Sequence, residues 1–533
     1  MSQYTKYYNP AKTPQNEPIP GKNQVENNAG GYVFQISKWD RLKRFLILGS
    51  DTPTYYQSVR KLTKENAGVV MECWTADPRI TAEIIDDVSF NGKAAKQDPA
   101  IFALALGVVH EDVKARTAAY AIVNRVCRTA SHLFQFVATC RELGKGNGRG
   151  MRRALAKWYE NKSTEALAYQ AIKYRQQNGF THKRCIELSN KGAGKEQGRR
   201  ELYMWMRGKH YDDNCIPDLI LAHLRAMESE NREELIQLVS KYKLPWEAIP
   251  TDALNDPGVW KAMLPHMGLT ALIRNLGNMT GCGAITQMDC ADVSFRLADR
   301  ADIFNSRMHP FSVLQALAVY KQGYGVRGRK SWTPIRQVID ALDEAFYHAF
   351  MNAEQTNKRI MLALDVSDSM RSSIMGSPLS CREASAALAL VTMSRESNVM
   401  VTGFTSGPTN SFRNPVLTEL LISPRQRLDD VIHEISGLPF GATDCALPMR
   451  YALDKQIPID AFVIYTDNET WHGTIHPVQA LKEYRRKMGI PAKLIVVGMT
   501  STGFSIADPD DAGMLDVVGM DSSVPKLISD FIK

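Results

Sequence analysis

The hydrophobic pattern of this chain changes its period near residue 358, and this change limits the fold more than any other feature. From about residue 40 to 350, apolar side chains recur every three or four residues, as in "PAIFALALGVV" and "ARTAAYAIVNRVC". Such spacing, bounded by Pro, Gly, Asn or Ser, is typical of amphipathic helices. Many short helices with no β-rich runs between them indicate an α-solenoid of HEAT-like repeats, with an irregular helical domain as the alternative.

After residue 358 the apolar runs become short and β-branched, as in "RIMLALDV", "AFVIYTD" and "AKLIVVGM". Amphipathic helical stretches such as "REASAALALVTMSRES" separate most of them. This alternation predicts a Rossmann-like α/β domain, with a parallel sheet covered on both faces. Ligands of such sheets bind at the carboxyl ends of the strands, which is where Asp365 and Asp467 stand.

Composition places the chain among soluble globular proteins. Of its 533 residues, 44% are hydrophobic and 23% are charged. The nine cysteines are scattered without a CxxC pair, which argues against a disulfide framework or a zinc site and suits a reducing compartment. With no signal peptide and no long apolar run, we expect a cytoplasmic protein that does not span a membrane. We predict a disordered leader over residues 1–21, a helical-repeat domain over 22–357 and the α/β domain over 358–533.

The loops at the strand ends of the α/β domain are rich in small oxygen-bearing side chains. "LALDVSDSM" places a carboxylate and two hydroxyls in one loop, and "FGATDCALP" adds a threonine before a helix. Without Cys or His, such a set suits a hard divalent cation, Mg²⁺ or Mn²⁺. The predicted ligands are Asp365, Ser367, Ser369, Thr443 and Asp467. The alternative is that these residues only cap a helix.

A cation between two aspartates could also activate water for phosphodiester hydrolysis, so a metal-dependent ribonuclease is an alternative function. The histidines nearest to these loops are His472 and His476, in "TWHGTIHP", and for both of them we favour a position on a surface loop over a catalytic role. Hydroxyl-rich metal sites usually bind rather than catalyse, and we therefore expect no enzyme.

Positive charge is concentrated before residue 356. Residues 356–533 hold 17 Lys and Arg against 20 Asp and Glu, so the earlier part carries the whole positive excess of the chain. Basic residues with glycines or aromatics beside them suit contacts with RNA phosphates and bases, and a solvated basic face is the alternative. Three clusters stand out: Lys145, Arg149, Arg152 and Arg153; Lys173, Arg175, His182 and Lys183; and Arg327, Arg329 and Lys330.

Two resemblances follow from these motifs. The D-x-S-x-S loop with Thr443 and Asp467 resembles the metal-ion-dependent adhesion site of von Willebrand factor A domains. A basic helical domain followed by such a domain resembles the Ro autoantigen family, whose helical part is called the TROVE module. Runs such as "RLKRFLILGSDTPTYY", "KYRQQNGFTHK", "MHPFSVLQAL" and "DNETWHGTIHP" are similar to that family along nearly the whole chain. "YTDNETW" is more similar to its bacterial members.

This resemblance implies a closed ring of HEAT-like repeats whose two ends are joined by the A domain. It implies a ribonucleoprotein that binds small noncoding Y RNA on the outer surface and single-stranded 3′ ends of misfolded RNA in the central hole. A 3′-to-5′ exoribonuclease is the implied partner in RNA quality control. His182 matches the Y RNA-contacting histidine of the family, and Arg274 and Asn275 are candidates for the pore, with a buried Arg–carboxylate pair as the alternative. We expect an RNA-binding scaffold, with a nuclease or a protein-adhesion module as alternatives.

Overall fold

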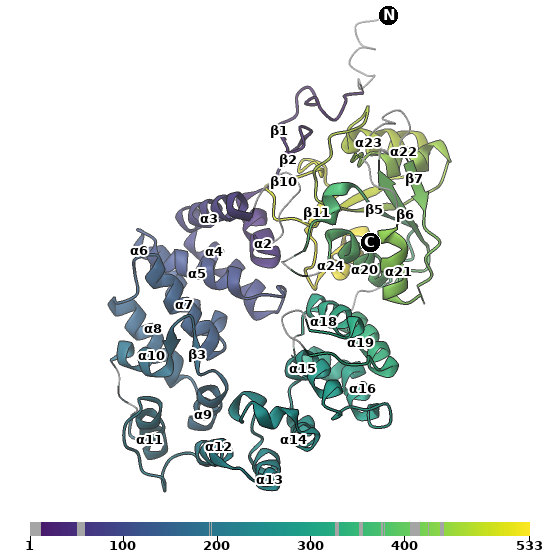
Figure 1. Ribbon diagram of the computed structural model, residues 1–533. Helices are drawn as coiled ribbons and strands as arrows, with labels where there is room; N and C mark the ends of the chain where they lie inside the picture. The colour runs from purple at the N-terminus through teal and green to yellow at the C-terminus, as the bar shows by residue number, and fades with distance from the viewer. Residues whose placement is uncertain are drawn as a thin grey trace, which may run out of the picture. The chain divides into compact units, whose positions relative to one another are not determined.

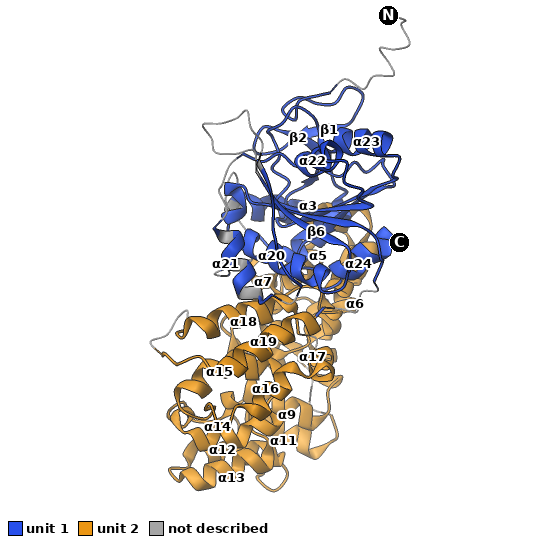
Figure 2. Ribbon diagram, turned by 90° about the vertical axis from the view of Figure 1, so that its right-hand side faces the viewer, with its two compact units in different colours: residues 1–69, 350–533 blue, residues 70–349 orange. Residues whose placement is uncertain are grey.

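The structure, a computed structural model, forms two compact units, coloured blue and orange in Figure 2. Unit 1 combines residues 1–69 with residues 350–533, and unit 2 spans residues 70–349. The described residues are 12–50, 59–190, 192, 194–306, 308–325, 330–350, 355–374, 377, 379–405, 416–424, 426–437 and 442–533.

Unit 1 is built on a six-stranded sheet with the order β11-β9-β8-β5-β6-β7. The strands are β5 (Ile360–Asp365), β6 (Val399–Thr405), β7 (Val416–Glu419), β8 (Ala461–Thr466), β9 (Lys493–Gly498) and β11 (Met514–Val518). Neighbours pair in parallel, except that β7 is antiparallel to β6 at one edge. Every residue of β5 and β8 is buried, as expected of central strands covered on both faces. The predicted α/β domain is confirmed, with a mixed sheet instead of a fully parallel one.

Helices cover both faces of this sheet (Figure 1). On one face, α22 (Leu447–Asp454) and α23 (Pro477–Met488) share a hydrophobic core with Met361, Phe462 and Leu494. The other face carries α20 (Cys381–Met393), α21 (Leu428–Ser436) and α24 (Val524–Ile532). There the hydroxyl of Tyr465 in β8 lies 3.4 Å from that of Thr392 in α20.

The N-terminal segment belongs to unit 1, which differs from the domain boundaries expected from the sequence. Strands β1 (Gln24–Glu26) and β2 (Tyr32–Gln35) form a small sheet with β10 (Phe504–Ser505), and Val33 and Phe34 enter the core of unit 1. Helix α2 (Lys38–Leu48) is also part of this unit. Residues 1–11 of the expected disordered leader lie outside the described residues. Within residues 12–21, however, Gln15 is completely buried, because its side chain and backbone bond to loops of unit 1.

Unit 2 is helical, as predicted, and most of its helices start at a polar capping residue such as Asp77, Asp112 or Ser163. Its helices are α4 (Pro78–Phe90), α5 (Asp98–Val109), α6 (Val113–Val126), α7 (Ala130–Glu142), α8 (Arg149–Glu160), α9 (Thr164–Lys173), α10 (His182–Ser189), α11 (Gln197–Met206), α12 (Asp218–Glu228), α13 (Arg232–Tyr242), α14 (Pro257–Met263), α15 (Leu269–Gly281), α16 (Ala291–Ala298), α17 (Arg300–Ser306), α18 (Pro310–Gln322) and α19 (Arg336–His348). Helix α3 (Val59–Ala76) crosses the boundary between the units.

Early and late segments of unit 2 meet. The Nε2 atom of His309, which precedes α18, lies 3.1 Å from the carbonyl oxygen of Lys93, in the loop between α4 and α5. Residues separated by more than 200 positions therefore line one cavity, described below. Closure of the helices into a ring by the α/β domain stays a prediction. No helix among the described residues has the length and apolar character needed to cross a membrane.

Candidate functional site

Parallel strands bring the predicted metal ligands to one edge of the sheet in unit 1. Asp365 is the last residue of β5, and Asp467 directly follows the adjacent strand β8. Thr443 lies in the loop before α22, and its carbonyl oxygen accepts a hydrogen bond of 3.1 Å from His472 N in the loop after β8. All five predicted ligands are buried: Asp365, Ser367, Ser369, Thr443 and Asp467.

Short hydrogen bonds fix the first of these carboxylates. Ser367 N donates to Asp365 Oδ1 at 2.9 Å, and the Thr466 hydroxyl donates to Asp365 Oδ2 at 2.7 Å. The hydroxyl oxygens of Ser367 and Ser369 are 3.2 Å apart. Local bonding within the loop therefore holds the D-x-S-x-S oxygens together on one side of the strand ends.

The second carboxylate has an oxygen with no partner. Asp467 Oδ1 accepts a hydrogen bond of 3.0 Å from Glu469 N, but Oδ2 is buried without a hydrogen bond among the described residues. Burial, and then the charge of Asp365, raise the pKa of Asp467 to about 7. Burial also raises the pKa of Asp365. The two carboxylates repel each other, and the charge of the buried Arg382 favours only the ionised form of Asp365, while Asp467 Oδ2 has no hydrogen-bond partner among the described residues.

This donor set fits a hard divalent cation. Two carboxylates and three hydroxyls offer oxygen ligands only, the type that Mg²⁺ and Mn²⁺ prefer. Among the described residues no three His, Cys, Asp or Glu side chains form a metal-binding group, so hydroxyls would have to complete the coordination. Asp365, Ser367, Ser369, Thr443 and Asp467 would hold the cation, which would supply a positive charge open to an anionic group of a partner.

The structure gives the positions of two residues near the predicted ligands, Asp368 and His476. Asp368, the variable residue of the motif, is exposed and forms an ion pair of 3.5 Å with Arg371. His476 is 1% exposed, with Nε2 2.7 Å from the Glu17 carbonyl oxygen, so the expected surface position is wrong for this residue. The N-terminal segment covers the loop that carries it, and burial lowers its pKa.

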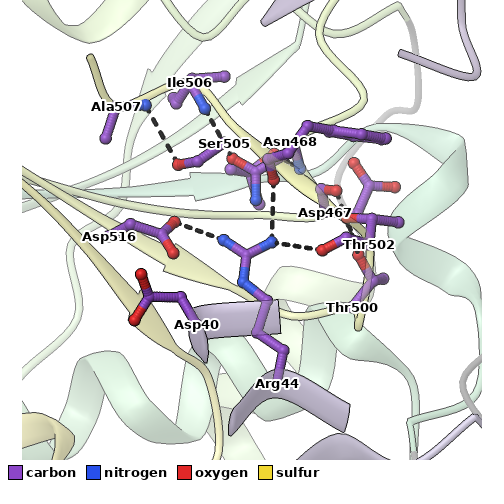
Figure 3. Close-up of polar contacts among 12 residues, drawn as sticks. Asp40, Arg44, Asp467, Asn468, Thr500, Thr502, Ser505, Ile506, Ala507 and Asp516 are labelled. Atoms are coloured by element: carbon purple, nitrogen blue, oxygen red, sulfur yellow. Dashed lines mark hydrogen bonds and ion pairs between the residues drawn. The ribbon is translucent and has the colours of Figure 1, made fainter. Parts of the chain in front are cut away.

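A buried arginine from α2 supports the same edge of the sheet (Figure 3). Arg44 is completely buried and donates to the carbonyl oxygens of Thr502 and Phe504, and it forms an ion pair with Asp516. The Thr500 hydroxyl in turn donates to the Asp467 carbonyl oxygen at 3.2 Å. No sequence pattern links an arginine of α2 with a loop more than 450 positions later.

Unit 2 contains a cavity of about 1130 Å³. Its lining comes from the loop before α5, the start of α7, the end of α9, and helices α15 and α18 with their flanking loops. The structure brings the predicted residues Lys173, Arg274 and Lys330 together here, with Asn275. Arg274 is exposed, so the alternative of a buried Arg–carboxylate pair is wrong.

The lining of the cavity combines cations, amides and aromatic rings. Tyr174 and Trp332 stand beside predicted basic clusters, whereas the sequence did not single out Arg128, His132, Trp246, Glu247, Asn278 and Tyr320. Burial, followed by the charge of Arg128, lowers the pKa of His132 to about 4, so this ring is neutral at pH 7. Trp332 stacks on Tyr320 at a centroid distance of 6.1 Å and donates to its carbonyl oxygen. These residues lie on separate segments and form no motif in the sequence.

The first predicted basic cluster lies on one face of α8 and, for Lys145, in the loop before that helix. Lys145, Arg149, Arg152 and Arg153 are all exposed. The opposite face of α8, which includes Met151, Leu155 and Trp158, is buried in unit 2. The helix therefore presents a continuous row of cations to solvent.

The second cluster is centred on a small hairpin, β3 (Gln176–Gln177) and β4 (Phe180–Thr181), whose turn contains Asn178 and Gly179 with positive φ. Arg175 and Lys183 are exposed on either side of this hairpin. His182 is different, because only 4% of it is exposed.

The His182 ring is part of the core of unit 2. Its Nδ1 lies 3.0 Å from the Tyr159 hydroxyl and its Nε2 lies 3.4 Å from the Gln170 carbonyl oxygen. Phe134 packs edge-on against the ring, and burial lowers the pKa of His182 to about 4. The residue anchors the hairpin and starts α10, while Arg175 and Lys183 remain available to a ligand. Of the third cluster, Lys330 lines the cavity, and Arg327 and Arg329 lie outside the described residues.

Comparison with known proteins agrees with this two-part architecture. The TROVE domain model matches residues 25–214 and 240–319, and the Ro60 vWA domain model matches residues 359–532. RNA-binding protein RO60 of Deinococcus radiodurans is 38% identical and covers 100% of this chain and 99% of that protein. RNA-binding protein RO60 of Caenorhabditis elegans is 34% identical, over 96% of this chain and 90% of that protein.

The fold is shared as well. The crystal structure of the Deinococcus radiodurans RO (RSR) protein superimposes with a TM-score of 0.69 at 37% sequence identity. It covers 93% of this chain and 99% of that chain. Because both domain models, the full-length relatives and the solved structure agree, the chain belongs to the Ro60 family.

Proposed function

We propose that this protein is an RNA-binding protein whose helical unit takes single-stranded RNA into the cavity of unit 2. Two observations support the proposal: the RO60 relatives are RNA-binding proteins, and the cavity has the right size and lining. Its volume of about 1130 Å³ lies above the range of roughly 300–1,000 Å³ that is usual for small-molecule pockets. The cavity suits a short stretch of a polymer.

The lining fits the chemistry of a nucleic acid chain. Lys173, Arg274 and Lys330, together with Arg128, provide cations for phosphates. The rings of Tyr174 and Trp332 can stack on bases, which gives affinity with little sequence preference. We therefore propose binding of unpaired 3′ ends of structured or misfolded RNA, with a strong dependence on salt.

A second, structured RNA would bind outside this cavity. The exposed cations of α8 and those beside the β3–β4 hairpin offer contacts to phosphates, which position an RNA without reading its sequence. We assign these surfaces to a Y-like noncoding RNA. His182 would act there by holding the hairpin in place, because its buried ring already has two partners.

The proposal includes no catalytic step. The metal site of unit 1 would bind a carboxylate or another anionic group of a partner protein, and a 3′-to-5′ exoribonuclease would act on the RNA held by unit 2. The protein would thus serve as the scaffold of a ribonucleoprotein in RNA quality control.

Binding of a labelled single-stranded RNA, followed across a salt series, tests this function. We expect Lys173→Ala combined with Arg274→Ala to weaken binding by at least tenfold and to make the slope of log K against log salt shallower. Each lost phosphate contact reduces the slope by about 0.7. Lys261→Ala is the matched control, because that exposed lysine pairs with Asp289 away from the cavity lining. Unchanged binding by the double variant contradicts the cavity assignment.

The same RNA reports on catalysis. Prolonged incubation with Mg²⁺ should leave it intact, whereas cleavage that disappears in Asp467→Ala would establish the ribonuclease alternative. Lack of any RNA binding at physiological salt would instead favour a protein-adhesion module.

A further inference from the structure

The loop that carries Asp467 is held from outside by the N-terminal strap, which we define as residues 13–31. Three strap side chains bond to the four residues Asp467–Thr470 or to their immediate neighbours, although about 440 positions separate them in the chain. Gln15 and Asn27 are buried, and Asn28 is partly buried. The function proposed above assigns no role to this segment.

Asn27 clamps the loop immediately after Asp467. Its Nδ2 donates to the carbonyl oxygens of Asn468 at 3.2 Å and of Thr470 at 2.7 Å. Its Oδ1 accepts from the backbone N–H groups of Ala29 and Gly31 and so fixes the turn of the strap itself. One amide group thus ties the shape of the strap to the shape of the loop.

Gln15 and Gly31 also contact the loop or the residues beside it. Gln15 Nε2 donates to Asp444 Oδ1 at 2.6 Å, next to the predicted ligand Thr443, and the Thr470 hydroxyl donates to Gln15 Oε1. The backbone of Gly31 lies directly on the loop, since a Cβ atom at that position would lie 1.9 Å from the Thr470 carbonyl oxygen. Only glycine permits this approach.

The loop needs such support. Asn468 has a φ of 66°, a left-handed conformation that costs free energy in a residue other than glycine. The neighbouring Glu469 is completely buried, with Oε1 accepting from Asn28 at 2.7 Å and Oε2 without a partner among the described residues. It does not form a three-residue acidic or histidine cluster with Asp365 and Asp467. We therefore treat Glu469 as part of the support and not as a ligand.

We propose that the N-terminal strap is a positioning element of the cation site, which sets divalent-cation affinity by fixing the Asp467–Thr470 loop through Asn27 and Gly31. The inference rests on the metal site proposed above. Residues that hold metal ligands in place typically change metal affinity by about 10–100-fold when they are replaced. The strap precedes the helical unit in the sequence, whereas the proposed metal ligands follow it. The support of the metal site would therefore come from the other side of the RNA-binding unit in the sequence.

Titration of the full-length protein with Mn²⁺, followed by electron paramagnetic resonance of the free ion, tests the proposal. Asn27→Asp is nearly isosteric, keeps the Oδ1 acceptor of the turn and removes both N–H donors to the loop. An added negative charge alone would attract Mn²⁺ more strongly, whereas loss of positioning weakens binding. We expect weakening by about tenfold or more.

Gly31→Ala provides a second, purely steric variant. We expect a comparable loss of Mn²⁺ affinity, and Gly68→Ala is the matched control because a Cβ there meets open space. RNA affinity, which depends on unit 2, should stay unchanged in both strap variants, and an unchanged thermal unfolding transition of the α/β domain shows that unit 1 is folded in them. Unchanged or tighter Mn²⁺ binding by Asn27→Asp overturns the inference. Failure of the wild type to bind Mn²⁺, or unaltered binding by Asp365→Ala, overturns the metal site itself.

Discussion

Two histidines of the helical unit lie where a charged ring would be costly. His182 is 4% exposed between Phe134 and Tyr159, and His132 lies at the wall of the cavity beside Arg128. Burial is the main cause that lowers the pKa of each ring from 6.5 to about 4. Both rings are therefore neutral in the folded protein over most of the pH range in which they would be charged in the unfolded chain.

We predict that the free energy of unfolding of unit 2 falls as the pH falls from 6.5 to 4. In this window the unfolded chain binds protons that the folded protein excludes, so each histidine removes up to about 3 kcal/mol of stability. His182→Gln should lower the free energy of unfolding at pH 7. Between pH 6.5 and 4, however, this variant should lose up to about 3 kcal/mol less stability than the wild type. Urea unfolding at several pH values, followed by circular dichroism, measures the difference.

His210→Gln is the control for this experiment, because that histidine is exposed. It should reproduce the pH dependence of the wild type. If His182→Gln and the wild type lose the same free energy of unfolding when the pH is lowered, the ring of His182 is not held neutral by burial.

At the scale of elements, α2 contributes a buried cation to unit 1 beside buried apolar side chains such as Leu42 and Phe45. Arg44 reaches two backbone carbonyl groups and Asp516 in β11, and the rest of its surroundings exclude water. We predict that Arg44→Met destabilises unit 1 by about 3 kcal/mol, since removal of the cation leaves a partly buried carboxylate and unpaired carbonyl oxygens. Thermal unfolding with a probe in the α/β domain measures this effect.

The neighbouring Lys43→Met should change stability by less than about 1 kcal/mol, because Lys43 forms only an exposed pair with Asp40. Combining Arg44→Met with Asp516→Asn should recover part of the loss, as the isolated charge is removed. Equal destabilisation by the Lys43 and Arg44 variants would mean that the buried contacts of Arg44 do not contribute to the stability of unit 1.

The grouping of the proposed metal ligands at one edge of the sheet was predictable from the sequence, whereas the contacts that support their loops were not. Asp365, Ser367 and Ser369 stand within one short loop, and the topology of a parallel sheet places Asp467 at the same edge. The strap is rich in Pro, Asn and Gln, a composition that normally indicates disorder. Its amides are satisfied only by a loop some 440 positions later, and such a pairing leaves no local signal.

The lining of the cavity could likewise be predicted only in part from the sequence. Lys173 and Lys330 were found through basic clusters, but Arg128 and Glu247 stand in segments with no distinctive pattern. They become neighbours only because early and late helices of unit 2 meet, as the contact between His309 and Lys93 shows. Helical periodicity predicts each element, and it does not specify which ends of a solenoid approach each other.

At the scale of the whole molecule, the family domains and the compact units divide the chain differently. The TROVE match begins at residue 25, yet residues up to 69 belong to unit 1. Strand β2 pairs with β10, and Val33 and Phe34 are buried in the core of the α/β domain. The N-terminal segment is therefore part of the fold of the C-terminal domain, even though it is joined covalently to the helical region.

We predict that a fragment of residues 355–533, which begins just before the vWA match at residue 359, folds poorly because its core and the Asp467 loop lose their N-terminal cover. Burial of Val33 and Phe34 alone is worth about 1.5–3 kcal/mol each, and the unpaired groups around Asp444 and Thr470 add to the loss. A peptide of residues 12–50, added in trans, should raise the melting temperature of the fragment with increasing peptide concentration. The same peptide with Phe34→Ala and Gly31→Ala should do so only at much higher concentration. If the fragment alone melts at the same temperature as unit 1 in the full chain, the N-terminal segment is an appendage and not a structural part of that unit.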